Sequence, residues 1–119
     1  MAKYVDGFVI PLPKRNLAAY TKMARLGRKI WLEHGALDYR EAVLDHVDTT
    51  CTPNFPANLS LKKNDTVIFA YITYRNRKHR DSVNAKVFND PRMQKFANVK
   101  MPFEMALMNF GGFRTIVGD

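Results

Sequence analysis

The clearest pattern of apolar and polar positions in the chain lies between residues 16 and 35. Apolar, aromatic or small residues recur there at alternating steps of three and four, ending with a histidine: Leu17, Tyr20, Ala24, Gly27, Trp31 and His34. This spacing places them on one face of a helix and leaves most of the basic residues elsewhere. We predict a helix that starts after Asn16 as its N-cap and ends at Gly35, where a left-handed residue can close it.

Four other segments are rich in β-branched and aromatic residues and predict strands. They are Tyr4–Ile10, Leu37–Val43, Thr66–Tyr74 and Phe110–Val117. Pro11 and Pro13 follow the first segment and are expected to stop it, because proline cannot donate to a sheet ladder. In the last segment, Gly111-Gly112 indicates a bulge or a tight backbone approach.

A second helix is predicted at Arg77–Asn89, with Asn76 as its N-cap. Its inward residues are expected to be Val83, Val87 and Phe88. Asp90-Pro91 interrupts the helix, and Pro91–Ala97 is expected to add one or two further turns. The stretch His46–Asp65 has no sustained period, and loops of this length are often lids, partner-facing or mobile.

The resulting order, β-α-β-β-α-β, predicts a ferredoxin-like α+β fold with a four-stranded antiparallel sheet and two helices on one face. We expect one domain over residues 1–119. The third strand is apolar on both faces, with Ile68, Ala70 and Ile72 on one and Val67, Phe69 and Tyr71 on the other. Since two helices cover only one face, the sequence predicts a homodimer that covers the other.

Composition limits the classes of function. Hydrophobic residues make up 46% of the chain, but no run of 18 apolar residues occurs, so no membrane-spanning helix is expected. The single cysteine, Cys51, excludes an intrachain disulfide and a cysteine-based metal site, which favours the cytoplasm. No metal or cofactor motif is present, so we expect neither. The net charge of +8 favours anionic partners.

Candidate chemistry comes from polar residues at positions that look buried. In an enzyme, His34 or Glu41 would act as general base and Asn84 would stabilise an oxyanion. Trp31, Tyr39 and Arg80 would line the ligand cavity. The carboxylates of Glu41 and Asp6 also fit plain ion pairs with Arg40 or Arg75, and His34 fits a helix-capping role.

The densest basic cluster is the segment 75–80. Arg75, Arg77 and Lys78 are candidate anion-binding residues at a helix N-terminus, and the segment is also a candidate RNA-binding patch. The cluster itself lacks the aromatic side chains on which single-stranded bases stack. The sequence therefore does not favour nucleic acid as the partner.

Five ordered segments carry a resemblance that spans nearly the whole chain: YVDGFVIPLPKRNLAAY, WLEHGALDYRE, YRNRKHRDSVNAKVFNDPRM, KMPFEMALM and NFGGF. In these the chain resembles the YbaA-like bacterial proteins, a family of unknown function. The resemblance implies a dimeric α/β-barrel fold, whose superfamily includes heme-degrading and cofactor-independent monooxygenases. The family has no established reaction, so the resemblance assigns no catalytic residue.

Three functional hypotheses follow. The first is a homodimer that binds a small-molecule or anionic ligand in a cavity between the sheet and the helices. The second is an enzyme of the cofactor-independent monooxygenase or isomerase type, and the third is RNA binding through residues 75–80. The loop His46–Asp65 and the segment Met101–Met108 are also candidates for contact with another protein.

Overall fold

The computed structural model describes residues 2–48, 50 and 53–118. Its elements are β1 Tyr4–Pro13, α1 Leu17–Glu33, β2 Asp38–Val43, α2 Phe55–Asn58, β3 Asp65–Tyr74, α3 Arg77–Phe88, α4 Pro91–Gln94 and β4 Asn109–Arg114. Short 3-10 turns lie at Lys14–Asn16, Lys95–Asn98 and Met105–Leu107. Cys51 lies outside the described residues.

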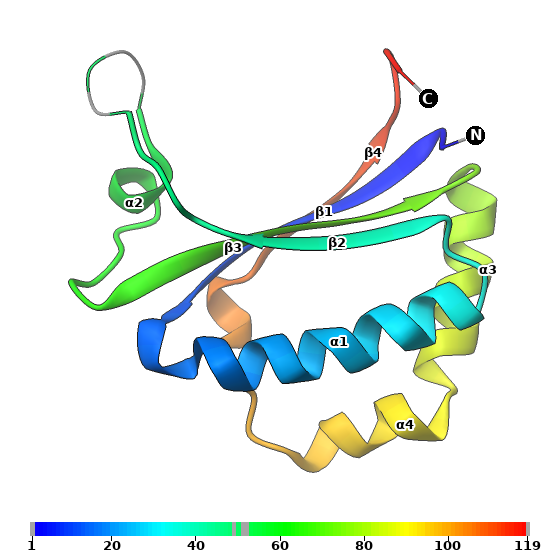
Figure 1. Ribbon diagram of the computed structural model, residues 1–119. Coiled ribbons are helices and arrows are strands. Elements are labelled where there is room, and N and C mark those ends of the chain that lie inside the picture. Colours follow the sequence, from blue (N-terminus) through cyan, green and yellow to red (C-terminus); the bar gives the residue numbers. More distant parts are fainter. Residues whose placement is uncertain (1, 49, 51–52, 119) are drawn as a thin grey trace.

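The strands form one four-stranded sheet in the order β2-β3-β1-β4, and every pairing in it is antiparallel. Helices α1, α3 and α4 lie on one side of this sheet, and the short helix α2 lies on the other side near one end (Figure 1). The predicted α+β class and four-stranded antiparallel sheet are confirmed. The predicted loop 46–65 differs from expectation in containing helix α2, which Asn54 caps by accepting a hydrogen bond from the Ala57 N–H at 2.9 Å.

The prediction that Pro11 and Pro13 stop the first strand is wrong, because β1 continues through both to Pro13. The Lys14 N–H donates to the Asn64 carbonyl at 2.8 Å, so the even-numbered residues at this end of β1 bond to β3. Pro11 and Pro13 are odd-numbered, so their backbone nitrogen atoms point to the other edge of β1, the edge that pairs with β4. Pairing with β4 ends at Val9, so no strand among the described residues needs the N–H groups that the two prolines lack.

The last strand is shorter than predicted and ends at Arg114. The Thr115 N–H still donates to the Lys3 carbonyl at 2.9 Å, but β1 starts at Tyr4, and Ile116 is 80% exposed. The expected close approach at the glycine pair is present without a break in register. The Phe113 ring lies against Gly111, and a Cβ on Gly112 would collide with the Tyr4 hydroxyl.

Two of the three expected helix-end residues act as predicted. The Asn76 side chain accepts from the His79 N–H at 2.8 Å at the start of α3, and Gly35 has φ of +112° after α1. The prediction for Asn16 is wrong: its side chain makes no cap bond and instead donates to the Pro102 carbonyl at 2.8 Å. A 3-10 turn leads into α1, so Asn16 does not have the extended backbone that a capping side chain requires.

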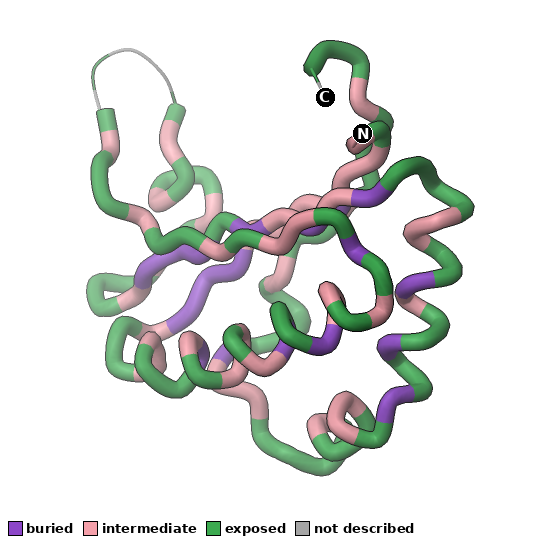
Figure 2. The backbone as a smooth tube through the Cα atoms, turned by 45° about the vertical axis from the view of Figure 1, so that its right-hand side comes forward, coloured by how far each residue is buried: buried purple, intermediate pink, exposed green. Residues whose placement is uncertain are grey.

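The core lies between the sheet and the helices, where the buried residues gather in two clusters (Figure 2). One contains Ile10, Leu12, Tyr20, Ile68, Ala70 and Phe103, and the other contains Ile30, Ala36, Ile72, Tyr74, Val83 and Val87. Phe88 was predicted to point inward, but it is 60% exposed and contacts Trp31 edge-on with ring centroids 6.2 Å apart. Phe88 follows Val87 directly, about 100° further round the helix at 3.6 residues per turn, so its side chain leaves the buried face of α3.

The opposite face of the sheet remains largely uncovered within the chain. Phe69 and Phe113 are 52% and 60% exposed there, and Tyr71 is half-buried beside Phe69 with ring centroids 6.5 Å apart. Phe55 of α2 packs near Val67 and leaves the middle of the face open. The open face, defined here by Val5, Val9, Phe69, Tyr71 and Phe113, is therefore the surface that the sequence predicts a second subunit would cover.

Within the described part of the chain, no helix is both long and apolar enough to cross a bilayer. The same residues contain no group of three or more histidine, cysteine or acidic side chains placed to hold a metal ion.

Candidate functional site

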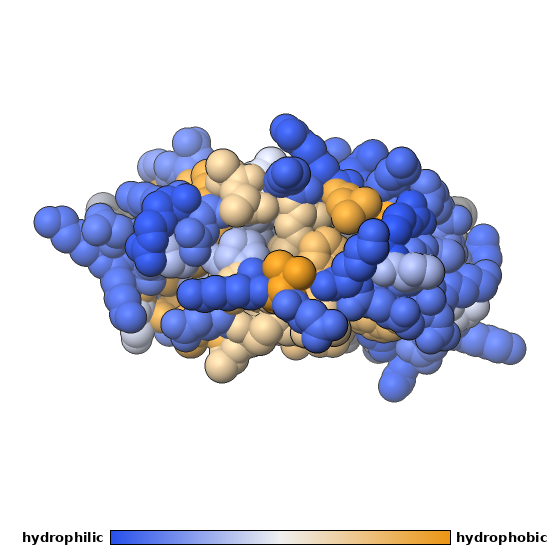
Figure 3. Space-filling model, turned by 90° about the horizontal axis from the view of Figure 1, so that it is seen from below, coloured by the Kyte–Doolittle hydropathy of each residue, from blue (hydrophilic) through white to orange (hydrophobic). Residues whose placement is uncertain are grey.

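A cavity of about 170 Å³ lies between the sheet and helix α1, and the segment from α4 to β4 forms its remaining wall. Its lining is almost entirely aromatic, aliphatic or methionine: Phe8, Ile10, Tyr20, Met23, Ala24, Gly27, Trp31, Tyr39, Glu41, Ala70, Ile72, Met93, Phe96, Met101, Phe103 and Met108. We call it the inner cavity. Seen from the helix side, hydrophobic residues are visible near the centre of the molecule between hydrophilic ones (Figure 3).

Glu41 is the one charged residue among the described residues that line the inner cavity. It stands on β2, and each of its carboxylate oxygens accepts a hydrogen bond from a phenol. Tyr20 of α1 donates to Oε1, and Tyr39 of β2 donates to Oε2 at 2.6 Å. The carboxylate therefore takes its partners from two neutral hydroxyl groups, whereas the sequence suggested an arginine.

The two phenols are fixed as hydrogen-bond donors. Burial raises the pKa of Tyr20 and of Tyr39 well above the usual value, and the neighbouring charge of Glu41 raises both further. Both hydroxyl groups consequently stay protonated over the whole physiological range. This arrangement holds a carboxylate at the boundary of an apolar space.

Gly27 gives Tyr39 the room to reach this position. A Cβ on Gly27 would lie 3.0 Å from the Tyr39 hydroxyl oxygen, closer than ordinary van der Waals contact. A second, outer hollow of about 280 Å³ lies along α1 and β2, and Arg25, Arg28 and Thr21 contribute to its lining. Tyr20, Ala24, Tyr39 and Glu41 line both spaces, so Glu41 stands between the inner cavity and the outer hollow.

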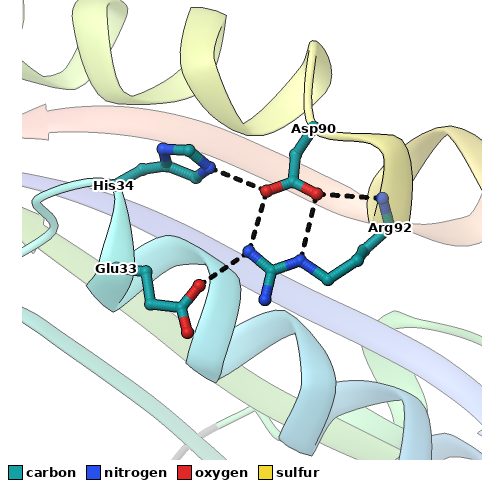
Figure 4. Close-up of polar contacts among 4 residues, drawn as sticks. All are labelled: Glu33, His34, Asp90 and Arg92. Carbon is teal, nitrogen blue, oxygen red and sulfur yellow. Dashed lines mark hydrogen bonds and ion pairs between the residues drawn. The ribbon is translucent and has the colours of Figure 1, made fainter.

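His34 belongs to a separate cluster at the end of α1 (Figure 4). Its Nε2 lies 2.9 Å from Asp90 Oδ2, and the Arg92 guanidinium bonds both to Asp90, at 2.8 and 3.1 Å, and to Glu33 at 2.6 Å. Asp90 also caps α4 by accepting from the Arg92 N–H at 2.9 Å. The cluster fastens the end of α1 to the turn between α3 and α4.

Acid is expected to weaken this cluster. Hydrogen bonds from Arg92 first, and from His34 second, hold the pKa of Asp90 well below its usual range. A lowered pKa in the folded state contributes stability above the ordinary value near 4, and that contribution is lost as the pH falls further. The difference in unfolding free energy between the wild type and Asp90→Asn should therefore shrink between pH 6 and pH 3.

Chemical denaturation at several pH values measures this difference. Asp45→Asn, at an exposed aspartate, serves as the control and should show little change. A difference for Asp90→Asn that stays constant from pH 6 to pH 3 would contradict the assigned role of Asp90.

Asn84 and Arg80 belong to a third cluster, between β1 and α3. The Arg80 Nη1 lies 2.9 Å from Asp6 Oδ1, and Asp6 is only 1% exposed. Asn84 Oδ1 accepts from the Trp31 indole N–H at 3.1 Å and from the Tyr74 hydroxyl at 3.3 Å. Burial raises the pKa of Asp6, and the charge and hydrogen bond of Arg80 oppose that rise.

Comparison with known proteins places the chain in a family. The family model described as "Protein of unknown function (DUF1428)" matches residues 3–105. The chain belongs to this family. It is also 35% identical over 117 residues to "Uncharacterized protein YbaA" of Escherichia coli K12 and of Shigella flexneri, covering 98% of this chain and 99% of each relative. The resemblance to the YbaA-like bacterial proteins is thereby confirmed.

In this DUF1428 chain the predicted site residues separate into two groups. Trp31, Tyr39 and Glu41 meet at the inner cavity. His34, Asn84 and Arg80 are not among the described residues that line it, because each is held in one of the other two clusters. The structure therefore does not bring His34, Glu41 and Asn84 around one reacting centre.

From the sequence, Tyr20 is expected to be a core residue first and a cavity-lining aromatic second, and its hydrogen bond to Glu41 was not predicted. The available signal was the pair of phenols: Tyr20 lies on the inward stripe of α1, and Tyr39 lies two residues from Glu41 on the same strand face. A carboxylate on an apolar face needs donors, and tyrosines on the facing stripe can supply them.

In this DUF1428 chain, fewer basic side chains of the segment 75–80 are exposed than its sequence suggests. Arg80 turns inward to Asp6, and His79 Nδ1 accepts from the Arg75 N–H at 3.0 Å. Arg75, Arg77 and Lys78 are exposed around the first turn of α3, so their role in anion binding stays a prediction. Burial and the charge of Arg75 lower the pKa of His79, which makes this histidine a poor source of further positive charge.

Proposed function

We propose that this protein binds a small, largely apolar molecule in the inner cavity, one per subunit, with Glu41 as the polar anchor. The observation that carries the proposal is a carboxylate held by two phenols at the wall of an otherwise apolar cavity. Binding sites for small molecules are usually apolar spaces with a few converging polar groups. The absence of a membrane-spanning helix among the described residues, together with the lone Cys51, supports a location in the cytoplasm.

The proposal includes a homodimer built through the open face. The strand order β2-β3-β1-β4 supports a ferredoxin-like subunit, and an apolar sheet face on each subunit supports a two-sheet barrel in the dimer. In such a dimer the two sheets would pack through Phe69 and Phe113, and the inner cavities would lie on the outside of the barrel. Each cavity would keep its own entrance on the helix side.

An enzymatic role is the second candidate, and the position of Glu41 supports it. A carboxylate at the edge of an apolar cavity is suited to accept a proton from a bound substrate, as in an isomerase or a cofactor-independent monooxygenase. Tyr20 and Tyr39 would hold the carboxylate in place and share its charge. In this enzymatic hypothesis Glu41 alone carries the chemistry, in place of the three residues His34, Glu41 and Asn84 that the sequence suggested.

A cavity-filling substitution tests the binding proposal. Ala24→Leu adds a branched side chain where α1 lines the inner cavity, and it should exclude the ligand without removing Glu41. In a thermal-shift screen of small apolar compounds, a ligand at about 100 times its Kd stabilises the wild type by about 2.7 kcal/mol. The same compounds should leave the melting temperature of Ala24→Leu nearly unchanged.

Ala18→Leu is the matched control, since Ala18 is exposed on the same helix. This variant should respond to the compounds as the wild type does. A screen without any compound that stabilises the wild type would reject the proposal, and compounds that stabilise Ala24→Leu equally would place their site elsewhere.

A further inference from the structure

The charge inside the inner cavity is unbalanced. Glu41 carries the cavity's carboxylate, while the other described lining residues are uncharged. Arg25 and Arg28 line the outer hollow with Glu41, yet no ion pair joins either of them to Glu41 among the described residues. Among the described residues, the carboxylate that borders the inner cavity therefore has no cation within ion-pair distance.

The carboxylate also has acceptor capacity left over. Two oxygens offer about four lone-pair positions, and Tyr20 and Tyr39 occupy one on each oxygen. A ligand that donates a charged hydrogen bond would complete the site.

Aromatic side chains surround the space next to this charge. Trp31 and Tyr39 have ring centroids 5.9 Å apart at an angle of 44°, and Phe8, Phe96 and Phe103 line the same cavity. The faces of aromatic rings attract cations, tryptophan most strongly. Aromatic rings beside a lone carboxylate are the arrangement by which proteins recognise organic ammonium groups.

We propose that the ligand is a small organic amine, bound as its ammonium ion, with an aromatic or branched alkyl body. This inference rests on the binding function proposed above and adds the chemical class. The ammonium group would donate to Glu41, and the apolar body would lie among the methionine and phenylalanine side chains of the inner cavity. A cavity of about 170 Å³ suits a body of the size of benzene, because an engineered cavity of about 150 Å³ binds benzene itself.

The net charge of +8 acts against a cation only at long range. Exposed charges are screened over about 8 Å at physiological ionic strength, whereas a contact with Glu41 inside the cavity is screened much less. The overall charge should therefore slow the approach of an amine without removing its affinity. Binding is best measured near 0.15 M salt for this reason.

Trp31 is the chain's single tryptophan and lines the cavity, so its fluorescence reports on occupancy. The test titrates the protein with benzylamine, benzyl alcohol, toluene and benzoate, which share one ring and differ in the polar group. Benzylamine should bind about 10- to 100-fold more tightly than benzyl alcohol, the range expected of a hydrogen bond to a charged group. Benzoate should bind most weakly.

Glu41→Gln keeps the shape of the side chain and removes its charge. It should abolish the preference for benzylamine over benzyl alcohol, whereas Glu104→Gln, at an exposed glutamate, should retain it. The comparison of compounds on the wild type stands even if Glu41→Gln fails to fold.

The outcomes separate this inference from the binding proposal. If benzyl alcohol, toluene or benzoate binds as tightly as benzylamine, or if only neutral or anionic compounds from the wider screen bind, the amine class is wrong and the cavity keeps its binding function. If no compound of either set binds, both are wrong.

Discussion

Replacing Arg80 by alanine is expected to lower the free energy of unfolding by about 3–5 kcal/mol, the cost of breaking a buried ion pair from one side. The change leaves the Asp6 carboxylate, 1% exposed, without its cation at the centre of the sheet. It also removes the guanidinium that lies 5.1 Å from the centroid of the Tyr4 ring. Urea denaturation followed by circular dichroism measures the loss.

Two further variants show that the loss comes from the stranded carboxylate. Arg77→Ala removes an exposed arginine from the same helix and should change stability by less than about 0.5 kcal/mol. Combining Asp6→Asn with Arg80→Ala should recover part of the loss, because the neutral amide no longer needs a cation.

The stability loss caused by Arg80→Ala should depend on pH in a direction that the pKa of Asp6 determines. Burial raises the pKa of Asp6 in the folded state, and removing Arg80 takes away the main opposing influence. A raised folded-state pKa makes the carboxylate destabilising at high pH, and this penalty disappears as the pH falls below the ordinary value near 4. The deficit of the variant should therefore be largest at neutral pH, and a deficit that grows on acidification would contradict this account of Asp6.

Placing a charge on the open face is expected to dissociate the homodimer that we propose. Phe69 stands on β3 with about half of its surface exposed in the single chain, and Phe69→Glu would bury a carboxylate in the interface between two sheets. An unpaired charge in such a place costs several kcal/mol. The dissociation constant should rise by more than about 100-fold.

Sedimentation velocity at low micromolar concentration gives the result directly. The wild type should sediment as a dimer and Phe69→Glu as a folded monomer. Phe88→Glu introduces the same charge at an exposed phenylalanine on the helix side and should remain dimeric. A wild type that is monomeric under these conditions would disprove the role assigned to the open face.

The sequence predicted the elements of the fold because their signals are local. The stripe of α1, the cap at Asn76 and the β-branched run of β3 each involve neighbours within a few residues. Two errors arose where a distant part of the chain decides the outcome. Pro11 and Pro13 stay in β1 because none of the described strands lies beside that part of its second edge, and Asn16 bonds to the distant Pro102 carbonyl.

The candidate site was predictable only in part for the same reason. Strand parity placed Tyr39 and Glu41 on one face, and the helical stripe brought Trp31 towards them. The partners of the polar groups depend on how helices sit on the sheet: His34 meets Asp90, 56 positions away, and Trp31 meets Asn84, 53 positions away. Periodicity along one element cannot supply such pairings.

The most direct test of the account is a crystal structure of the protein with the strongest binder from the compound screen. We expect electron density for the compound in the inner cavity, between α1 and the sheet. One polar atom of the compound should lie within about 2.7–3.2 Å of a Glu41 oxygen, as in an ordinary hydrogen bond. A compound found only in the outer hollow or on the open face, with the inner cavity closed by its own side chains, would contradict the account.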